Sequence, residues 1–244
     1  MARCLLFVPI LVLLVGARAR AVENWVTHPE SGFVAPAHTG AVNRVVADES
    51  GLVLSIGADG FLVIWDSVTM TARERFQLSR YPLEKLSLRP GKSEIAVYES
   101  DGFDFYRISV WNYAEKERRF NIPLTSPALY CAYTALGNYL VIGFHNGFQI
   151  FDGDSGELRG EKLEGYPVTL AVSSLTERTL QTYSPSGVLA YWDLDKLNLT
   201  RSFSVTANLR GPLVFGNYRF LAGDDGDKLF VIDAVSGKTF FETG

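Results

Sequence analysis

Two short sequence markers recur along the chain with a shared spacing of about 40 residues, and this repeat limits the fold more than any other feature. The first marker is a turn pair, and its copies are Asp59-Gly60, Asp101-Gly102, Asn146-Gly147, Ser186-Gly187 and Asp225-Gly226. The second marker closes an apolar run, and its copies are Trp65-Asp66, Trp111-Asn112, Phe151-Asp152, Trp192-Asp193 and Ile232-Asp233. The first residues of these closing pairs lie 46, 40, 41 and 40 residues apart. Two marker series with one period indicate five copies of a single structural unit.

Each unit carries the sequence pattern of four short strands. Asp-Gly and Asn-Gly pairs suit tight two-residue hairpin turns, because both central residues of such turns need positive φ. Apolar alternation in the first unit predicts strands at 42–46, 52–56, 61–65 and 73–77, and the third unit repeats the arrangement at 129–133, 139–143, 148–151 and 157–162. Four strands in a period near 40 predict an all-β fold, a propeller of about five four-stranded blades. The predicted blades span 38–77, 81–120, 127–162, 167–204 and 212–243, in a domain covering 22–244.

The first unit, HTGAVNRVVADESGLVLSIGADGFLVIWD, resembles the WD-repeat (WD40) β-propeller family. The resemblance implies a buried, hydrogen-bonded structural tetrad, which here would consist of His38, Ser55, Asp59 and Trp65. It covers about residues 33 to 243, and the later units are degenerate copies that have lost most of the tetrad. These later units are also similar to quinoprotein-like propellers.

Closure of the predicted ring is a separate question. Propellers of the WD-repeat family commonly have seven blades, whereas five units already account for nearly all of this chain after its N-terminal segment. Residues 32–35 resemble an outer strand that could complete the last blade, yet 238–243 supply that blade with its own outer strand. The alternatives are a five-bladed ring, an open arc completed by another chain, and a piece of a longer protein, which we favour. Because an open arc leaves apolar faces and strand edges unpaired, we expect residues 22–244 to be poorly stable alone.

The N-terminal segment has the layout of a cleavable signal peptide over residues 1–21. An early Arg precedes an apolar stretch from Leu5 to Val15, and small residues with Ala-x-Ala spacing follow. The stretch is short for a bilayer span, which needs about 20 residues. We therefore predict an exported protein, secreted or periplasmic, or in the endoplasmic reticulum lumen of a eukaryote, with no membrane attachment after cleavage. The alternative is an uncleaved N-terminal anchor.

The charge and the cysteine content of the mature chain limit which partners it can bind and which interactions can stabilise it. Cleavage would move the formal charge from −4 to −7, because the segment carries three arginines and no acids. An acidic chain argues against a nucleic-acid partner, since such proteins present concentrated Lys and Arg. Only Cys131 would remain, so no disulfide can form within the chain.

No residue pattern in the chain predicts a catalytic, cofactor or metal site. Three unclustered histidines and one cysteine lack metal-ligand spacing, and no Gly-x-Ser-x-Gly elbow or phosphate-binding glycine loop occurs. The alternative to a non-catalytic protein is an extracytoplasmic propeller enzyme or cofactor protein of the lactonase or quinoprotein kind. That alternative needs polar side chains converging on the central channel, whereas apolar residues follow Pro82, Pro127, Pro167 and Pro212 where the inner strands should begin.

The second unit suggests where another protein could bind. Its turn pair stands nine residues before its closing Trp, against five in the first unit, so the hairpin is longer at one rim. Aromatic and Arg side chains dominate binding hot spots, and we predict partner contacts at Phe105, Tyr106 and Arg107. His145 lies in the equivalent turn of the third unit and is a further candidate contact. The predicted function is an exported, non-catalytic protein-interaction scaffold.

Overall fold

The computed structural model describes residues 25–27, 34–48, 50–69, 71–163 and 165–243. The predicted signal peptide and His28 lie outside these residues. All regular structure within them is β-strand, twenty-two strands in total. The described part of the chain includes no helix that is long and apolar enough to cross a membrane.

Twenty of the strands form five antiparallel four-stranded sheets, which are the blades. Blade 1 consists of β3 (Val42–Ala47), β4 (Leu52–Gly57), β5 (Phe61–Asp66) and β6 (Ala72–Gln77). Blade 2 consists of β7 (Leu83–Leu88), β8 (Glu94–Ser100), β9 (Tyr106–Asn112) and β10 (Glu117–Pro123). Blade 3 consists of β11 (Tyr130–Tyr133), β12 (Tyr139–Phe144), β13 (Gly147–Asp152) and β14 (Leu158–Lys162). Blade 4 consists of β15 (Leu170–Ser173), β16 (Thr179–Ser184), β17 (Val188–Asp193) and β18 (Leu199–Ser204). Blade 5 consists of β19 (Arg210–Phe215), β20 (Phe220–Asp224), β21 (Leu229–Asp233) and β22 (Lys238–Glu242).

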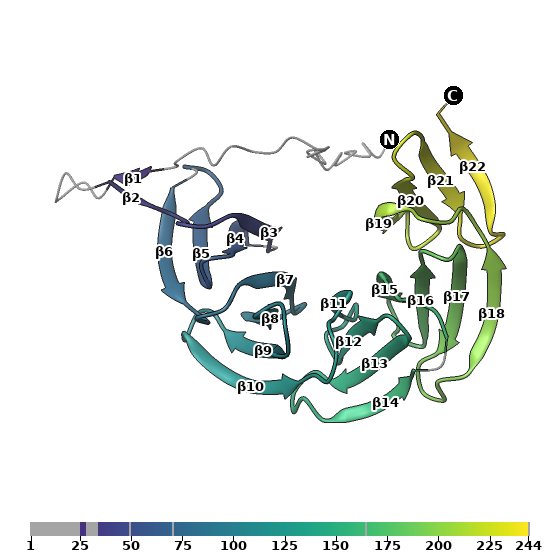
Figure 1. The fold of residues 1–244 in the computed structure, drawn as a ribbon, viewed down its shortest axis with the longest axis horizontal. Helices are drawn as coiled ribbons and strands as arrows, with labels where there is room; N and C mark the ends of the chain where they lie inside the picture. The colour runs from purple at the N-terminus through teal and green to yellow at the C-terminus, as the bar shows by residue number, and fades with distance from the viewer. Residues whose placement is uncertain (1–24, 28–33, 49, 70, 164, 244) are drawn as a thin grey trace, which may run out of the picture.

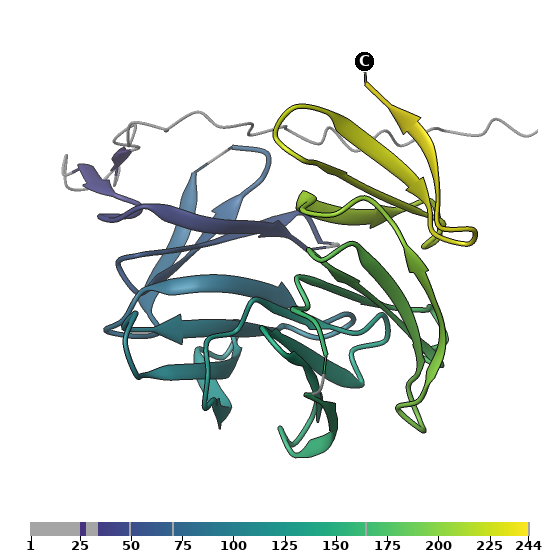
Figure 2. The ribbon, with the colours of Figure 1, turned by 45° about the vertical axis from the view of Figure 1, so that its right-hand side comes forward.

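The blades stand side by side around a common axis, which confirms the predicted all-β propeller (Figure 1). The first strand of every blade, from β3 to β19, lies near the axis, and the fourth lies at the periphery. Figure 2 shows the same sheets turned by 45°, with blade 5 in yellow at the end of the series. Since every blade is a simple up-and-down meander, the second-to-third strand turns gather at one rim, the turn rim. The first-to-second and third-to-fourth turns gather at the opposite rim.

The side chains of each blade alternate between two faces, and each face makes the same kind of contact in successive blades. The leading face contacts the next blade and includes the residue before each closing marker, such as Ile64 in blade 1. The trailing face contacts the preceding blade and includes the closing residue itself, such as Trp111 in blade 2. Ile64 and Trp111 accordingly belong to one apolar core between blades 1 and 2, and three further cores of this kind join the later blades. Buried apolar surface at these junctions is the main source of stability.

The closing Asp or Asn of each unit has a local structural role. The Asp66 carboxylate accepts the backbone N–H groups of Val68 (2.8 Å) and Thr69 (2.9 Å), and so it fixes the turn between β5 and β6. The same capping occurs at the other four closing residues: Asn112, Asp152, Asp193 and Asp233. A carboxylate or amide oxygen two residues before an N–H stabilises a turn in this way. The repeated marker thus encodes a hairpin of each blade.

Buried polar groups add specific contacts at two of the blade junctions. Arg89, at the end of β7, donates to the carbonyl oxygens of Gly137 (2.8 Å) and Gly153 (2.7 Å) in blade 3. Glu177, in the β15–β16 turn, accepts the N–H of Leu136 (2.7 Å) and the side-chain amide of Asn138 (2.7 Å). These contacts satisfy turn groups that the junction takes out of water.

The series of blades is open. The inner strands of consecutive blades contact one another from β3 to β19, but no interface of this kind joins β19–β22 to β3–β6 among the described residues. Figure 1 shows blades 1 and 5 apart, at the two ends of an arc. Of the segment 32–35, the described residues belong to β2 (Val34–Pro36), which pairs with β1 (Trp25–Thr27) and not with blade 5. Blade 5 instead has its own outer strand, β22, as the sequence predicted from residues 238–243.

Candidate functional site

The four residues of the predicted tetrad lie together on the trailing face of blade 1. The Asp59 carboxylate is 3.0 Å from His38 Nδ1, and His38 Nε2 is 2.8 Å from Ser55 Oγ. Trp65 Nε1 donates to the same Oγ at 2.8 Å. With a neutral imidazole every proton has an acceptor: Nδ1–H donates to Asp59, and the Ser55 hydroxyl donates to Nε2 while it accepts from Trp65. This series of hydrogen bonds connects the segment before β3 to β4 and β5, which is a structural role.

Burial and hydrogen bonding act in opposite directions on Asp59. Burial alone would raise the pKa of the carboxyl, but the bonds from His38 and from the backbone N–H of Thr39 outweigh it and lower the pKa below its usual value. The carboxylate therefore stays charged at neutral pH and continues to accept the imidazole N–H.

The longer hairpin of blade 2 forms an aromatic cluster on the turn rim, consisting of Tyr81, Phe103, Phe105 and Tyr106. The rings of Tyr81 and Phe105 lie 4.5 Å apart between centroids, which joins the β6–β7 linker to the β8–β9 turn. The Tyr106 hydroxyl donates to the Phe103 carbonyl, so the hairpin also closes on itself. Phe103 is 84% exposed. The cluster therefore combines a supported base with one projecting ring.

Asp101 holds the backbone of this hairpin in shape. One oxygen of its carboxylate accepts the N–H groups of Phe103 (2.9 Å), Asp104 (3.2 Å) and Phe105 (3.0 Å). These bonds, that from Phe103 first, lower the pKa of Asp101 below its usual value. A preorganised hairpin loses little conformational entropy on binding, which favours recognition.

Arg107 is committed to an internal contact. Its guanidinium donates to both oxygens of Glu99, at 2.6 Å and 3.3 Å, and the Glu99 side chain is fully buried. The same guanidinium lies 5.0 Å from the centre of the Phe105 ring. Because a buried carboxylate needs its partner, the first role of Arg107 is to neutralise Glu99 and support the cluster from below.

The structure places the other candidate contact in a different blade. His145 is exposed in the β12–β13 turn, on the same rim as the aromatic cluster but in blade 3. Tyr81 was absent from the sequence prediction, because it lies in a linker of another unit and only the fold brings it to Phe105. Phe103 stands in the extended hairpin that the spacing singled out, but its exposure could not be read from the sequence.

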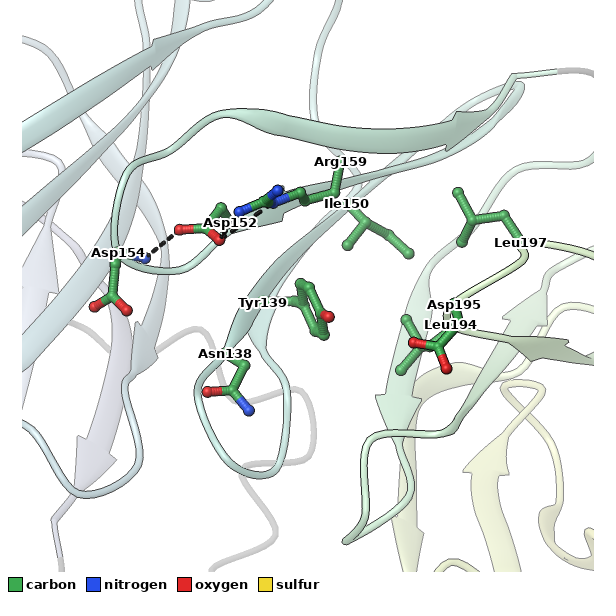
Figure 3. Close-up of a pocket in the computed structure, with 9 residues that line it drawn as sticks. All are labelled: Asn138, Tyr139, Ile150, Asp152, Asp154, Arg159, Leu194, Asp195 and Leu197. Atoms are coloured by element: carbon green, nitrogen blue, oxygen red, sulfur yellow. Dashed lines mark hydrogen bonds and ion pairs between the residues drawn. The ribbon is translucent and has the colours of Figure 1, made fainter.

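The opposite rim carries an open cavity of about 440 Å³ between blades 3 and 4 (Figure 3). Turn residues of both blades line it together with three leucine and isoleucine side chains: Asn138, Tyr139, Ile150, Asp152, Asp154, Arg159, Leu194, Asp195 and Leu197. In Figure 3 the carboxylates of Asp152 and Asp154 lie on one side of the cavity and Asp195 lies on the other.

Two of the three carboxylates at this cavity are already paired. Arg159 donates to Asp152 from Nε (3.2 Å) and Nη2 (2.6 Å), and this bond, followed by the N–H of Ser155, lowers the pKa of Asp152 far below its usual value. Asp154 pairs with Lys92 at 2.6 Å. Permanently ionised, paired carboxylates are poor general acids at neutral pH. Within the described ranges no group of three or more His, Cys, Asp or Glu is arranged to hold a metal ion.

The repeated four-stranded sheets and their shared cores define a β-propeller domain. The family model TP_0598_N, described as an N-terminal β-propeller domain, matches residues 17–243, and the chain belongs to this family. The chain is also similar to an uncharacterized protein of Treponema pallidum (strain Nichols), with 27% identity over 214 residues that make up 87% of this chain. The match covers 35% of that relative, so the chain spans about a third of the relative's length.

Proposed function

We propose that this propeller domain is an exported, non-catalytic scaffold that binds other proteins through its turn rim. The observation that carries the proposal is the aromatic cluster, in which an exposed Phe103 ring projects from a hairpin that Asp101 and Tyr81 hold in place. Large, rigid aromatic side chains with a polar surround are the usual anchors of protein interfaces.

The non-catalytic part of the proposal draws support from the chemistry of the cavity. Its paired carboxylates are engaged by Arg159 and Lys92, and so they cannot serve as the free acid and base that hydrolysis by two carboxylates requires. Export is supported by the signal-like segment at 1–21, which leads into the family domain. N-terminal sequencing of the protein recovered from the medium or periplasm tests this part; an intact Met1 on cell-associated protein contradicts it.

Binding through the rim is tested by removing the exposed ring alone. Phe103→Ala should leave the fold intact, because the ring packs little. It should weaken binding of the partner that the wild-type protein captures by about 2 kcal/mol, which raises the Kd roughly thirtyfold. Val68→Ala is a matched control, since Val68 is 90% exposed on the opposite rim. Arg107→Ala is a poor choice because it would leave the buried Glu99 carboxylate unpaired and damage the fold. Equal binding by the wild-type protein, Phe103→Ala and Val68→Ala would contradict the proposal.

A further inference from the structure

The two ends of the arc expose the two halves of the interface that joins its other blades. Each junction brings the leading face of one blade onto the trailing face of the next. In blade 5 the leading face has no following blade, and in blade 1 the trailing face has no preceding blade among the described residues. The second and third strands of all five blades pair without a register shift, so positions counted from the closing residue can be compared directly.

On the leading face, the comparison position lies three residues before each closing residue. In blade 5 it is Leu229, and this residue is 42% exposed. In the other four blades the equivalent residue is at most 1% exposed: Leu62, Ile108, Phe148 and Leu189. The residue type is large and apolar in all five blades, so what differs at Leu229 is the missing neighbour.

An aromatic row extends the exposed leading face of blade 5. The rings of Phe215 and Phe220 lie 5.4 Å apart, and those of Phe220 and Phe240 lie 5.3 Å apart. Phe240 is 70% exposed, and Phe241, which pairs with Val231 of the leading face, is half exposed. A contiguous group of exposed phenylalanines on one sheet face is typical of an interaction surface.

The trailing face of blade 1 shows the complementary exposure. Val45 on the inner strand pairs with Ser55 and is 57% exposed. Its register equivalents in blades 2 to 4 are Leu86, Cys131 and Ala171, and they are at most 7% exposed because the preceding blade covers them.

We propose that the arc binds one further blade, a four-stranded antiparallel sheet that packs one apolar face on Leu229 and Phe240 and the other on Val45. This occupant continues an interface that the arc already repeats four times, so it needs no new kind of contact. We assign it to the region that follows the N-terminal propeller in longer family members, since about two thirds of the treponemal relative lies outside the match. The proposed protein-binding rim is a separate surface, so the two proposals can fail independently.

A second copy of the chain is a poorer occupant. If blade 1 of that copy packed on Leu229 with the same junction geometry, four more blades would follow it around the axis. The gap is bounded on its far side by blade 1 of the first copy, as Figure 1 shows, and these blades would collide with it.

Photo-crosslinking in the native cell tests the proposal on the whole protein. A photoreactive phenylalanine analogue replaces Phe240 in one variant and Val45 in a second. Val68, which is 90% exposed in the β5–β6 turn, serves as the control. We expect both test positions, and not the control, to crosslink to peptides of one blade-type sequence with a closing Trp, Phe or Ile before Asp or Asn.

Each other outcome overturns part or all of the proposal. Peptides from residues 25–243 of another copy would identify a homo-oligomer, and crosslinks no stronger than at Val68 would show that the faces are free. Peptides without the repeat would show a partner that is not a blade, and blade-type peptides from an unrelated gene would refute the assignment of source. Phe103→Ala should leave these crosslinks unchanged, which separates this result from failure of the rim proposal.

Discussion

Removing the Ser55 hydroxyl should destabilise the propeller about twice as much as removing an equivalent hydroxyl in blade 4. Ser55→Ala leaves both His38 Nε2 and Trp65 Nε1 without a partner, whereas Thr182→Val leaves only Trp192 Nε1 without one. Both substitutions delete a buried hydroxyl and little else, so their comparison isolates the number of lost hydrogen bonds.

The expected magnitude follows from the burial of these groups. A buried polar group left unsatisfied costs about 1–3 kcal/mol, with the lower end suited to the partly exposed Trp side chains. His38 and Ser55 have almost no exposed side-chain surface. We therefore expect a loss of about 2–4 kcal/mol in unfolding free energy for Ser55→Ala and of about 1–2 kcal/mol for Thr182→Val.

Urea unfolding monitored by Trp fluorescence and by far-UV circular dichroism measures both losses, and coincident transitions would justify the two-state free energies. The measured slope should be the same for all three proteins, since the surface exposed on unfolding hardly changes. The reasoning is refuted if Ser55→Ala costs no more than Thr182→Val, because the tetrad would then carry no more than a single Trp–hydroxyl bond.

Three further predictions concern a turn, acid stability and the thiol. Gly147→Ala should unfold blade 3 at ordinary temperature, because φ is +145° and a Cβ would lie 1.7 Å from the Lys162 carbonyl oxygen; a melting temperature close to wild type contradicts this. The pKa of Asp66 is lowered to about 2, first by the Thr69 N–H, so its stabilisation is complete above pH 4 and lost as the pH falls toward 2. Thermal melts between pH 6 and 2 should show this loss, reduced in Asp66→Asn; an equal loss in both proteins would rule Asp66 out as the cause. Burial raises the pKa of Cys131 to about 12, so the thiol should react with maleimide only after unfolding, and rapid labelling of the native protein would contradict its burial.

Within each blade, the sequence was sufficient to predict the strands and turns, because the interactions that form them are local. Turn pairs such as Asp59-Gly60, closing pairs such as Trp65-Asp66 and the alternation between them specify a hairpin through contacts a few residues apart. The period of about 40 residues then repeats that specification five times, and the observed strands follow it closely. The grouping of His38, Ser55, Asp59 and Trp65 was equally accessible, through the resemblance of the first unit to the WD-repeat family.

The junctions between blades were decided by tertiary structure alone. No pattern around Glu99 announces that Arg107 must neutralise it, and nothing near Tyr81 indicates that its ring meets Phe105. The openness of the arc was likewise undetermined, because Leu229 looks like any other core leucine of the repeat in the sequence. A residue's local pattern sets which face of a sheet it occupies, but only the packing of separate sheets determines whether another sheet covers that face.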